Sequence, residues 1–196
     1  FVNLVQIGID VFGAARLGGA WHADGGHNQG RKLPLLLAAK ALGDGKMLEY
    51  ADAEKHLIFQ EDQQTFYVQQ HHVDTPRREI RGRRLDPYTQ EMIGRPEWGI
   101  RNSNQPERSS SNWNAYYRQV SGAPTTSHVL AARLMGLEEA WNHPPLFDYY
   151  DRFYRMQINP ETALGSGVNQ ITTFTRNMWE AYRHEPTPPK PGHGAP

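Results

Sequence analysis

The chain has 196 residues, enough for one domain with a sizeable core. Its 21 Lys and Arg balance its 21 Asp and Glu, which argues against a general nucleic-acid or membrane-surface binder, because such proteins carry a clear excess of positive charge. The sequence contains no cysteine, which excludes a disulfide framework and thiolate catalysis.

The composition leaves two interpretations open. Aromatic residues form 11% of the chain although the mean hydropathy is -0.73, which suits either a polar cleft with stacking platforms or a protein with long surface loops. No apolar run has the length of a membrane span. Phe1 already lies in a periodic apolar segment, so we expect either a C-terminal portion of a longer protein or a mature N-terminus left by cleavage.

The first quarter of the chain predicts two helices around a polar loop. Apolar residues at helical spacing predict a largely buried helix over residues 1–17, with one polar stripe that includes Asp10. A second helix is predicted over residues 33–42, where Pro34 suits the first turn and small alanines allow a neighbouring helix to approach closely. A third, shorter helix is expected within residues 47–57.

The middle of the chain changes in character. Residues 58–74 are rich in β-prone side chains and predict one or two short strands or an extended arm. Residues 76–84 are basic, and residues 85–122 predict mainly loop because proline and serine recur there. Aromatic residues such as Trp98 argue that this loop is ordered, since disordered segments are poor in aromatics.

Helices return in the last third, over residues 128–141, 146–156 and 169–183. We therefore predict one helical domain over residues 1–184 with an insertion at about 58–122, followed by a Pro- and Gly-rich tail over residues 185–196. Helix pairs joined by short turns stack into solenoids or close into an α/α toroid. The predicted fold class is mainly α: helical hairpins of a partial or complete α/α toroid, with a long loop and short β-strand insertion.

The loop from Trp21 to Lys32 is the predicted centre of the functional site. It combines two histidines, Asp24, Asn28 and two basic side chains with glycines that allow tight turns. A polar loop between two buried helices is a common way to present reactive side chains from a rigid scaffold.

These residue types suit proton transfer on a sugar. Imidazoles exchange protons near neutral pH, Arg31 and Lys32 can pair with a substrate carboxylate, and Trp21 can stack on a pyranose ring. β-Elimination from a uronic acid needs a neutralised carboxylate, a base for the C5 proton and an acid for the leaving oxygen. The predicted catalytic residues are His22, His27, Arg31, Asp24 and, from elsewhere in the chain, Tyr117.

Three alternatives stay open for this loop. Hydrolysis would need a pair of carboxylates, for which Asp24 with Glu97 or Asp10 is the candidate. His22, Asp24 and His27 have the side chains of a zinc or manganese site, but their spacing matches no defensible motif, so we expect no metal and no other cofactor. In the third alternative the loop is only a turn whose polar side chains order the backbone.

The predicted substrate-binding residues come from the loop, the β-prone arm and the insertion. In the arm, neighbouring side chains of a strand point to opposite faces, so only one of His71 and His72 can face a site, and His72 is preferred. The insertion is dense in the amide, aromatic and guanidinium groups found in glycan sites, although the same groups could instead hold a long loop in place. The set is Trp21, Asn28, Lys32, His72, Trp98, Asn102, Trp113 and Arg118.

The unit His22-Ala23-Asp24-Gly25-Gly26-His27-Asn28-Gln29-Gly30-Arg31-Lys32 and its flanking helices resemble parts of bacterial carbohydrate-active α/α-toroid proteins, which include polysaccharide lyases and glycoside hydrolases. The resemblance covers the first quarter of the chain and the later order of helices. It implies a toroid, a long sugar cleft, and catalysis by His, Tyr, Asn and Arg or by acidic pairs. A full toroid has about twice as many helices as this chain offers.

We therefore expect a secreted or periplasmic carbohydrate-active enzyme that acts on a polysaccharide, with a lyase favoured over a glycoside hydrolase. The alternatives are a non-catalytic glycan-binding or self-assembling module, and a metal-dependent hydrolase. The expected partner is a polysaccharide or oligosaccharide, together with a missing N-terminal portion or further copies of the chain. Neither nucleic acid nor a membrane is expected as a partner.

Overall fold

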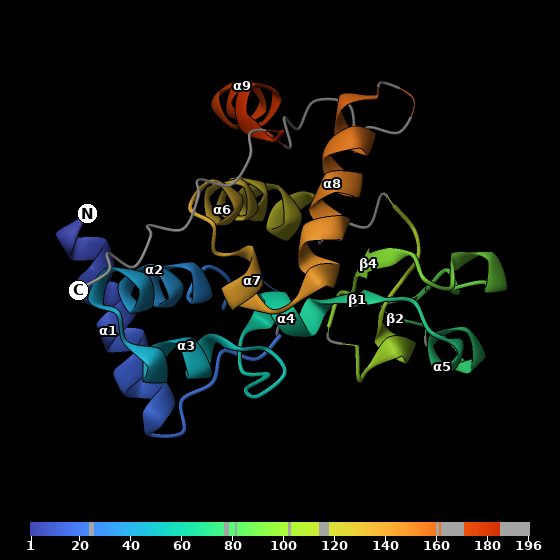
Figure 1. Ribbon diagram of the computed structural model, residues 1–196. Helices are drawn as coiled ribbons and strands as arrows, with labels where there is room; N and C mark the ends of the chain where they lie inside the picture. The colour runs from blue at the N-terminus through green and yellow to red at the C-terminus, as the bar shows by residue number, and fades with distance from the viewer. Residues whose placement is uncertain are drawn as a thin grey trace.

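The computed structural model describes residues 1–23, 26–76, 79–80, 82–101, 103–113, 118–159, 161 and 171–184, and these are mainly helical. Figure 1 shows α1, α2 and α3 together at one side of the molecule, and β1, β4 and α5 at the other. The short helix α4 and the long helix α8 lie between these two groups. The predicted tail over residues 185–196 lies outside the described residues.

Helices α1 (Val2–Arg16) and α2 (Lys32–Leu42) confirm the two N-terminal helices predicted from periodicity. They pack closely at Gly8, where a Cβ would overlap the carbonyl of Pro34 and lie 2.6 Å from Cβ of Ala38. The prediction that α1 is largely buried is wrong. Only one face of α1 meets its neighbours, and Val2 and Ile7 remain 77% and 49% exposed.

The predicted third helix is shorter than expected. Asp44 caps α3 (Gly45–Ala51) by accepting hydrogen bonds from the amides of residues 46 and 47, and the backbone leaves the helix at Asp52. The next helix, α4 (Gln60–Gln64), runs directly into strand β1 (Thr65–Tyr67). All five side chains of α4 are buried although all five are polar.

The β-prone arm forms only one short strand. β1 pairs antiparallel with β4 (Pro96–Trp98), so that Phe66 lies opposite Glu97. Residues Gln70–Asp74 form helix α5, so the predicted continuation of the strand is wrong. The amide of Gln69 donates to Nδ1 of His72 in a capping box, and this local hydrogen bonding outweighs the β propensity of the segment.

The predicted long loop is confirmed in its main character. Its regular parts are short: the strand β4, the 3-10 helices η1 (Gln90–Met92) and η2 (Pro106–Arg108), and the π-helix η3 (Arg118–Gly122). The basic stretch before this loop carries the strands β2 (Glu79–Ile80) and β3 (Arg83–Arg84). β2 and β3 form a separate two-stranded hairpin.

The predicted helix over residues 128–141 is in fact two helices, α6 (Ala123–Leu134) and α7 (Glu138–Trp141). The break contains Gly136, whose φ of 63° is a left-handed conformation that favours glycine. Helices α8 (Pro144–Ile158) and α9 (Thr173–Tyr182) follow.

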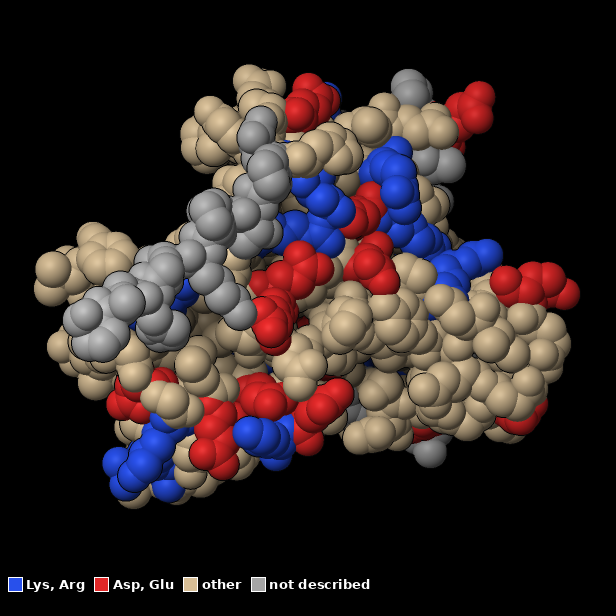
Figure 2. All heavy atoms as spheres, viewed as in Figure 1, with Lys and Arg blue, Asp and Glu red and all other residues tan. Residues whose placement is uncertain are grey.

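The core joins apolar side chains of α2, α6, α7 and α8. Phe147, Tyr150 and Tyr154 belong to it. Within the described residues, the helices are too short or too polar to cross a membrane. Figure 2 shows Lys and Arg interspersed with Asp and Glu over the viewed face, which accords with the balanced charge of the chain.

Candidate functional site

The loop after α1 rests on the buried polar side chains of α4. The amide of Ala23 donates to Oε1 of Gln63 at 2.8 Å, and the amide of Asn28 donates to Oε1 of Gln60 at 3.0 Å. These carboxamides replace the backbone partners that the irregular loop lacks, which explains how a short helix of five polar residues can be buried.

His22 is exposed, and its tautomer follows from its neighbour. Gln63 donates from Nε2 to the carbonyl of Leu57 at 2.8 Å and accepts the amide of Ala23, so the orientation of its amide is fixed. The same Nε2 lies 2.8 Å from Nδ1 of His22, which must therefore accept. The neutral ring carries its proton on Nε2, and the loop presents a hydrogen-bond donor to solvent.

The other polar side chains of the loop bind the loop itself. Arg31 donates from Nη1 to the carbonyls of His27 at 3.0 Å and of Gln29 at 2.6 Å. Asn28 donates from Nδ2 to the carbonyl of His22 at 2.9 Å. These contacts match the alternative in which polar side chains order the turn. His27 is exposed, and Asp24 lies outside the described residues.

Lys32 was predicted to bind substrate, but its side chain does not face the solvent. Its Nζ lies 2.6 Å from Oδ2 of Asp62 and 2.8 Å from the carbonyl of Trp141, and both charged side chains are 0% exposed. The indole of Trp141 donates to Oδ1 of Asp62 at 2.7 Å. This buried ion pair ties α2, α4 and α7 together, so Lys32 has a structural position.

Glu61 lies beside this ion pair and is also buried. Its Oε1 accepts the amide of Lys32 at 3.4 Å, whereas its Oε2 has no hydrogen-bond partner. Burial, and next the charge of Asp62, raise the pKa of Glu61 to about 7. A carboxyl group with this pKa is protonated in a large share of molecules near neutral pH.

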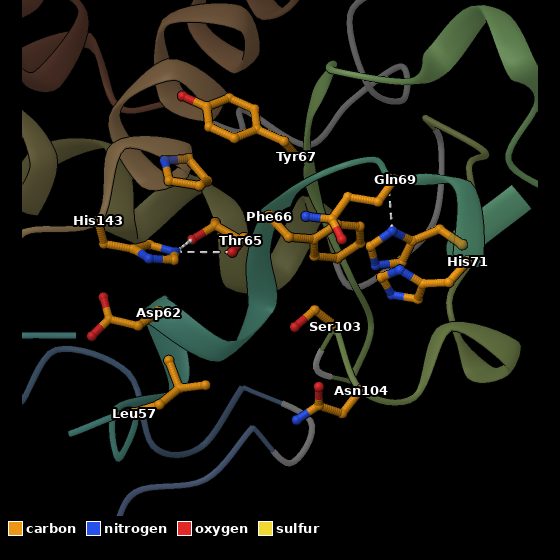
Figure 3. A pocket seen from close by; sticks show the side chains of 12 residues that line it. Leu57, Asp62, Thr65, Phe66, Tyr67, Gln69, His71, Ser103, Asn104 and His143 are labelled. Atoms are coloured by element: carbon orange, nitrogen blue, oxygen red, sulfur yellow. Dashed lines mark hydrogen bonds between the residues drawn. The ribbon is translucent and has the colours of Figure 1, made fainter. Parts of the chain in front are cut away.

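A pocket of about 310 Å³ opens beside α4 and β1, at the lower end of the range for small-molecule sites. Figure 3 shows that its side chains come from both sides of β1 and from separate parts of the chain. The lining is Leu57, Asp62, Thr65, Phe66, Tyr67, Gln69, His71, His72, Ser103, Asn104, His143 and Pro145.

His143 lies at one side of this pocket with its ring fixed. Its Nε2 is 2.9 Å from the carbonyl of Thr65 and 3.0 Å from Oγ1 of the same residue (Figure 3). Because that hydroxyl donates its hydrogen to the carbonyl of Glu61, both oxygens of Thr65 accept from Nε2. Neutral His143 therefore keeps Nδ1 as a proton acceptor, and burial lowers the pKa of the ring.

The opposite side of the pocket carries His71, His72 and Tyr67. His71 is exposed, whereas His72 is buried, stacks on Phe66 with ring centroids 4.4 Å apart, and uses Nδ1 to cap α5. Tyr67 donates its hydroxyl hydrogen to Asp148. Burial, and next the hydrogen bond with Asp148, raise the pKa of Tyr67 to about 12, so its phenol keeps its proton at neutral pH.

The predicted residues of the insertion form a separate cluster. Arg118 is buried, and its Nη2 lies 2.6 Å from Oε1 of Glu97. Trp113 packs against Arg118 and Arg152, with guanidinium carbons 5.5 and 5.0 Å from its ring centroid. Trp98 is buried in the core. These contacts hold the long loop onto α8, which matches the alternative in which the polar and aromatic groups of this segment keep the loop in place. Asn102 and Tyr117 lie outside the described residues.

Both carboxylate pairs considered for hydrolysis include Asp24, which lies outside the described residues. Glu97 is buried and ion-paired with Arg118 and Arg152, and Asp10 is exposed on α1, where it accepts a hydrogen bond from Gln6. Within the part of the chain that the structure describes, no group of three or more His, Asp or Glu side chains could hold a metal ion.

No protein-family profile, curated protein or solved structure matches the chain.

The structure thus divides the predicted residues into three groups. His72 lines the pocket, Asn28 and Arg31 bind their own loop, and Lys32, Trp98 and Arg118 are buried in the interior. The sequence predicted neither His143 nor Tyr67 as a site residue. One feature of the sequence could have pointed to His143. It stands directly before Pro144 and Pro145, and prolines at this spacing are typical of the first turn of a helix, so His143 is the residue at the helix start.

Proposed function

We propose that the chain is a carbohydrate-active enzyme that transfers protons on a polysaccharide, with β-elimination at a uronate favoured over hydrolysis. The observation that carries this proposal is the pocket in which imidazoles meet carboxamide and hydroxyl groups on an aromatic floor. These are the groups that bind sugars and exchange protons near neutral pH.

The charge of the pocket favours elimination over hydrolysis. Hydrolysis of a glycosidic bond uses two carboxyl groups that face each other across the substrate. Among the described lining residues the one carboxylate is Asp62, and it is already bound to Lys32 and Trp141. Imidazole bases and a protonated phenol, which elimination can use, are present instead.

The reaction balances without a cofactor. An imidazole nitrogen takes the C5 proton, the electrons of that C–H bond form the C4–C5 double bond, and the C4–O bond breaks with its electron pair on the leaving oxygen. The imidazolium then returns the proton to that oxygen. Gln69, Asn104 and the exposed ring of His71 are the described groups that could bind the substrate carboxylate.

A non-catalytic glycan-binding module is the second candidate. The observation in its favour is that Arg31 and Asn28 bind their own loop, so part of the predicted catalytic set only orders a turn. In both candidates the polysaccharide binds in the pocket, and both fit an α/α toroid completed by further helices. Secretion would bring the chain to such a polymer.

The test uses a panel of uronate-containing and neutral polysaccharides. Elimination produces an unsaturated sugar that absorbs in the ultraviolet, whereas hydrolysis produces reducing ends without this absorbance. We expect the unsaturated product, and we expect Asn104→Trp, which fills the pocket, to suppress it. Asn3→Trp, on an exposed position of α1 that does not line the pocket, is the matched control. Binding without product would favour the module, and neither binding nor product would overturn both candidates.

A further inference from the structure

One side of α4 holds the loop that runs from Trp21 to Lys32. Glu61 and Gln64 are three positions apart and Gln60 and Gln64 are four apart, so these side chains share a face of the helix. Their contacts with the loop are the amide of Asn28 to Oε1 of Gln60 at 3.0 Å, Nε2 of Gln29 to Oε1 of Gln64 at 3.3 Å, and the amide of Lys32 to Oε1 of Glu61 at 3.4 Å. Asn28 and Gln29 are half-buried whereas all of α4 is buried, so the loop forms a layer between this face of the helix and solvent.

Glu61 is the one member of this set that can change its charge. The residue is 3% exposed, and its Oε2 has no hydrogen-bond partner among the described residues. The neighbouring carboxylate of Asp62 already binds the ammonium group of Lys32 at 2.6 Å. A proton on Glu61 therefore leaves one negative charge for one ammonium group. Without that proton a second buried carboxylate lacks a cation of its own, which is strongly unfavourable.

We propose that Glu61 is a proton switch for the Trp21–Lys32 loop: the loop is closed on α4 while this carboxyl group is protonated, and loss of the proton releases the loop. Release brings water to Glu61 and hydrates its charge. The contacts of the neutral carboxamides are lost in the same event, because they hold the same segment. The switch operates without a ligand, so it is independent of the proposed function.

Release of the loop changes what it presents to solvent. In the closed loop, Gln63 holds the amide of Ala23 and fixes Nδ1 of His22 as an acceptor. Gly30, with φ of 85°, lies between these contacts and α2 and gives the backbone a residue at which it can turn. When the loop opens, the tautomer of His22 is no longer fixed. A buried carboxyl group thus controls an exposed imidazole.

The other titratable groups near Glu61 act in the opposite direction or at a different pH. Burial lowers the pKa of Lys32 of α2 and of His143, which feels the charges of both Asp62 and Lys32. A group whose pKa is lowered in the closed state loses its stabilising effect as pH falls, so it would open the loop in acid. Burial raises the pKa of Tyr150 of α8, which also faces Glu61, well above its ordinary value of 10. Opening that increases with pH near neutrality is therefore specific to Glu61.

The test is amide hydrogen exchange followed by NMR from pH 5 to pH 8, with each rate corrected for the intrinsic effect of pH on exchange. The amides of Ala23 and Asn28 report on the loop, and those of Tyr150 and Phe153 in α8 report on global unfolding. Burial, and next the charge of Asp62, raise the pKa of Glu61 from 4.5 to about 7 in the closed loop. By linkage, the opening constant of the loop should rise about 70-fold over this pH range. At pH 8 it should exceed the global unfolding constant at least about 100-fold, because the loop opens without the core.

Two neutral variants and one control isolate the carboxyl group. Glu61→Gln keeps an acceptor for the amide of Lys32 and has no proton to lose, so we expect its loop to stay closed through pH 8. Glu61→Met is the second neutral variant, and it serves if the carboxamide disturbs α4. Glu49→Gln removes an exposed carboxyl group of α3 and should behave like wild type.

Each of three results would overturn the switch. Loop amides that exchange no faster than those of α8 would show that only global unfolding exposes Glu61. Faster loop exchange that changes less than about threefold between pH 5 and pH 8 would show that the loop opens without Glu61. A rise with pH that persists in Glu61→Gln and Glu61→Met would assign the switch to another group. The polysaccharide panel, in contrast, tests the proposed function alone.

Discussion

Removal of the ammonium group of Lys32 should destabilise the protein far more than it affects ligand binding. Lys32 and Asp62 have fully buried side chains 2.6 Å apart. Lys32→Met keeps the aliphatic chain between Phe59 and Trp141 but leaves the carboxylate of Asp62 buried without its cation. Breaking a buried ion pair in this way costs about 3–5 kcal/mol.

This loss is a large part of the stability of an ordinary domain, which is about 5–15 kcal/mol. For a chain of this size it corresponds to a drop in melting temperature of about 2–4 °C per kcal/mol. Chemical denaturation followed by circular dichroism would measure it. Lys32→Met with Asp62→Asn removes both charges and keeps an acceptor for the indole of Trp141, so we expect it to lie within about 2 kcal/mol of wild type.

A different result would show that Lys32 has another role. If Lys32→Met changes the free energy of unfolding by less than about 1 kcal/mol while glycan binding is lost, the side chain reaches substrate, as the sequence alone suggested. The structural account of the ion pair would then be wrong.

Three further predictions concern buried groups and the loop. The pKa of Glu61 is about 7 in place of 4.5, so the folded state binds its proton more tightly than the unfolded state, and up to about 3 kcal/mol of stability should be lost as pH rises from 4.5 to 7. Glu61→Gln should remove this loss in unfolding experiments at several pH values, and an unchanged slope would contradict it. Gly26 has φ of 103°, and a Cβ there would overlap Oγ of Ser121, so Gly26→Ala should cost about 1–3 kcal/mol. Ser121→Gly in that background should recover only part, and full recovery would show that the backbone is not strained. Arg118→Met leaves Glu97 buried with Arg152 as its remaining cation and should lower stability by about 3–5 kcal/mol. A melting temperature equal to that of wild type would refute this.

The helices were predictable where periodicity is strong. α1, α2 and α8 have apolar residues at helical spacing and appear where expected. α5 was not predictable from propensity, because it begins at a capping box formed between Gln69 and His72. The exposed apolar face of α1 was also missed, since periodicity indicates which face can be buried and not whether a partner covers it.

The site was harder to predict than the helices. The loop after Trp21 was found as a polar segment, but the sequence could not show that the buried carboxamides of Gln60 and Gln63 hold it. The pocket depends on the meeting of Tyr67, Asn104 and His143, which lie far apart in the chain. Tyr67 belongs to β1, which packs against α8 directly after His143. Contacts of this kind leave no periodic pattern in a sequence.

The most direct measurement is a crystal structure of the protein soaked with a uronate-containing oligosaccharide. The account predicts continuous density in the pocket beside β1, with a sugar ring beside Tyr67, His71 and Asn104. An oligosaccharide seated instead on the exposed surface of the Trp21–Arg31 loop, with that pocket left to solvent, would contradict it.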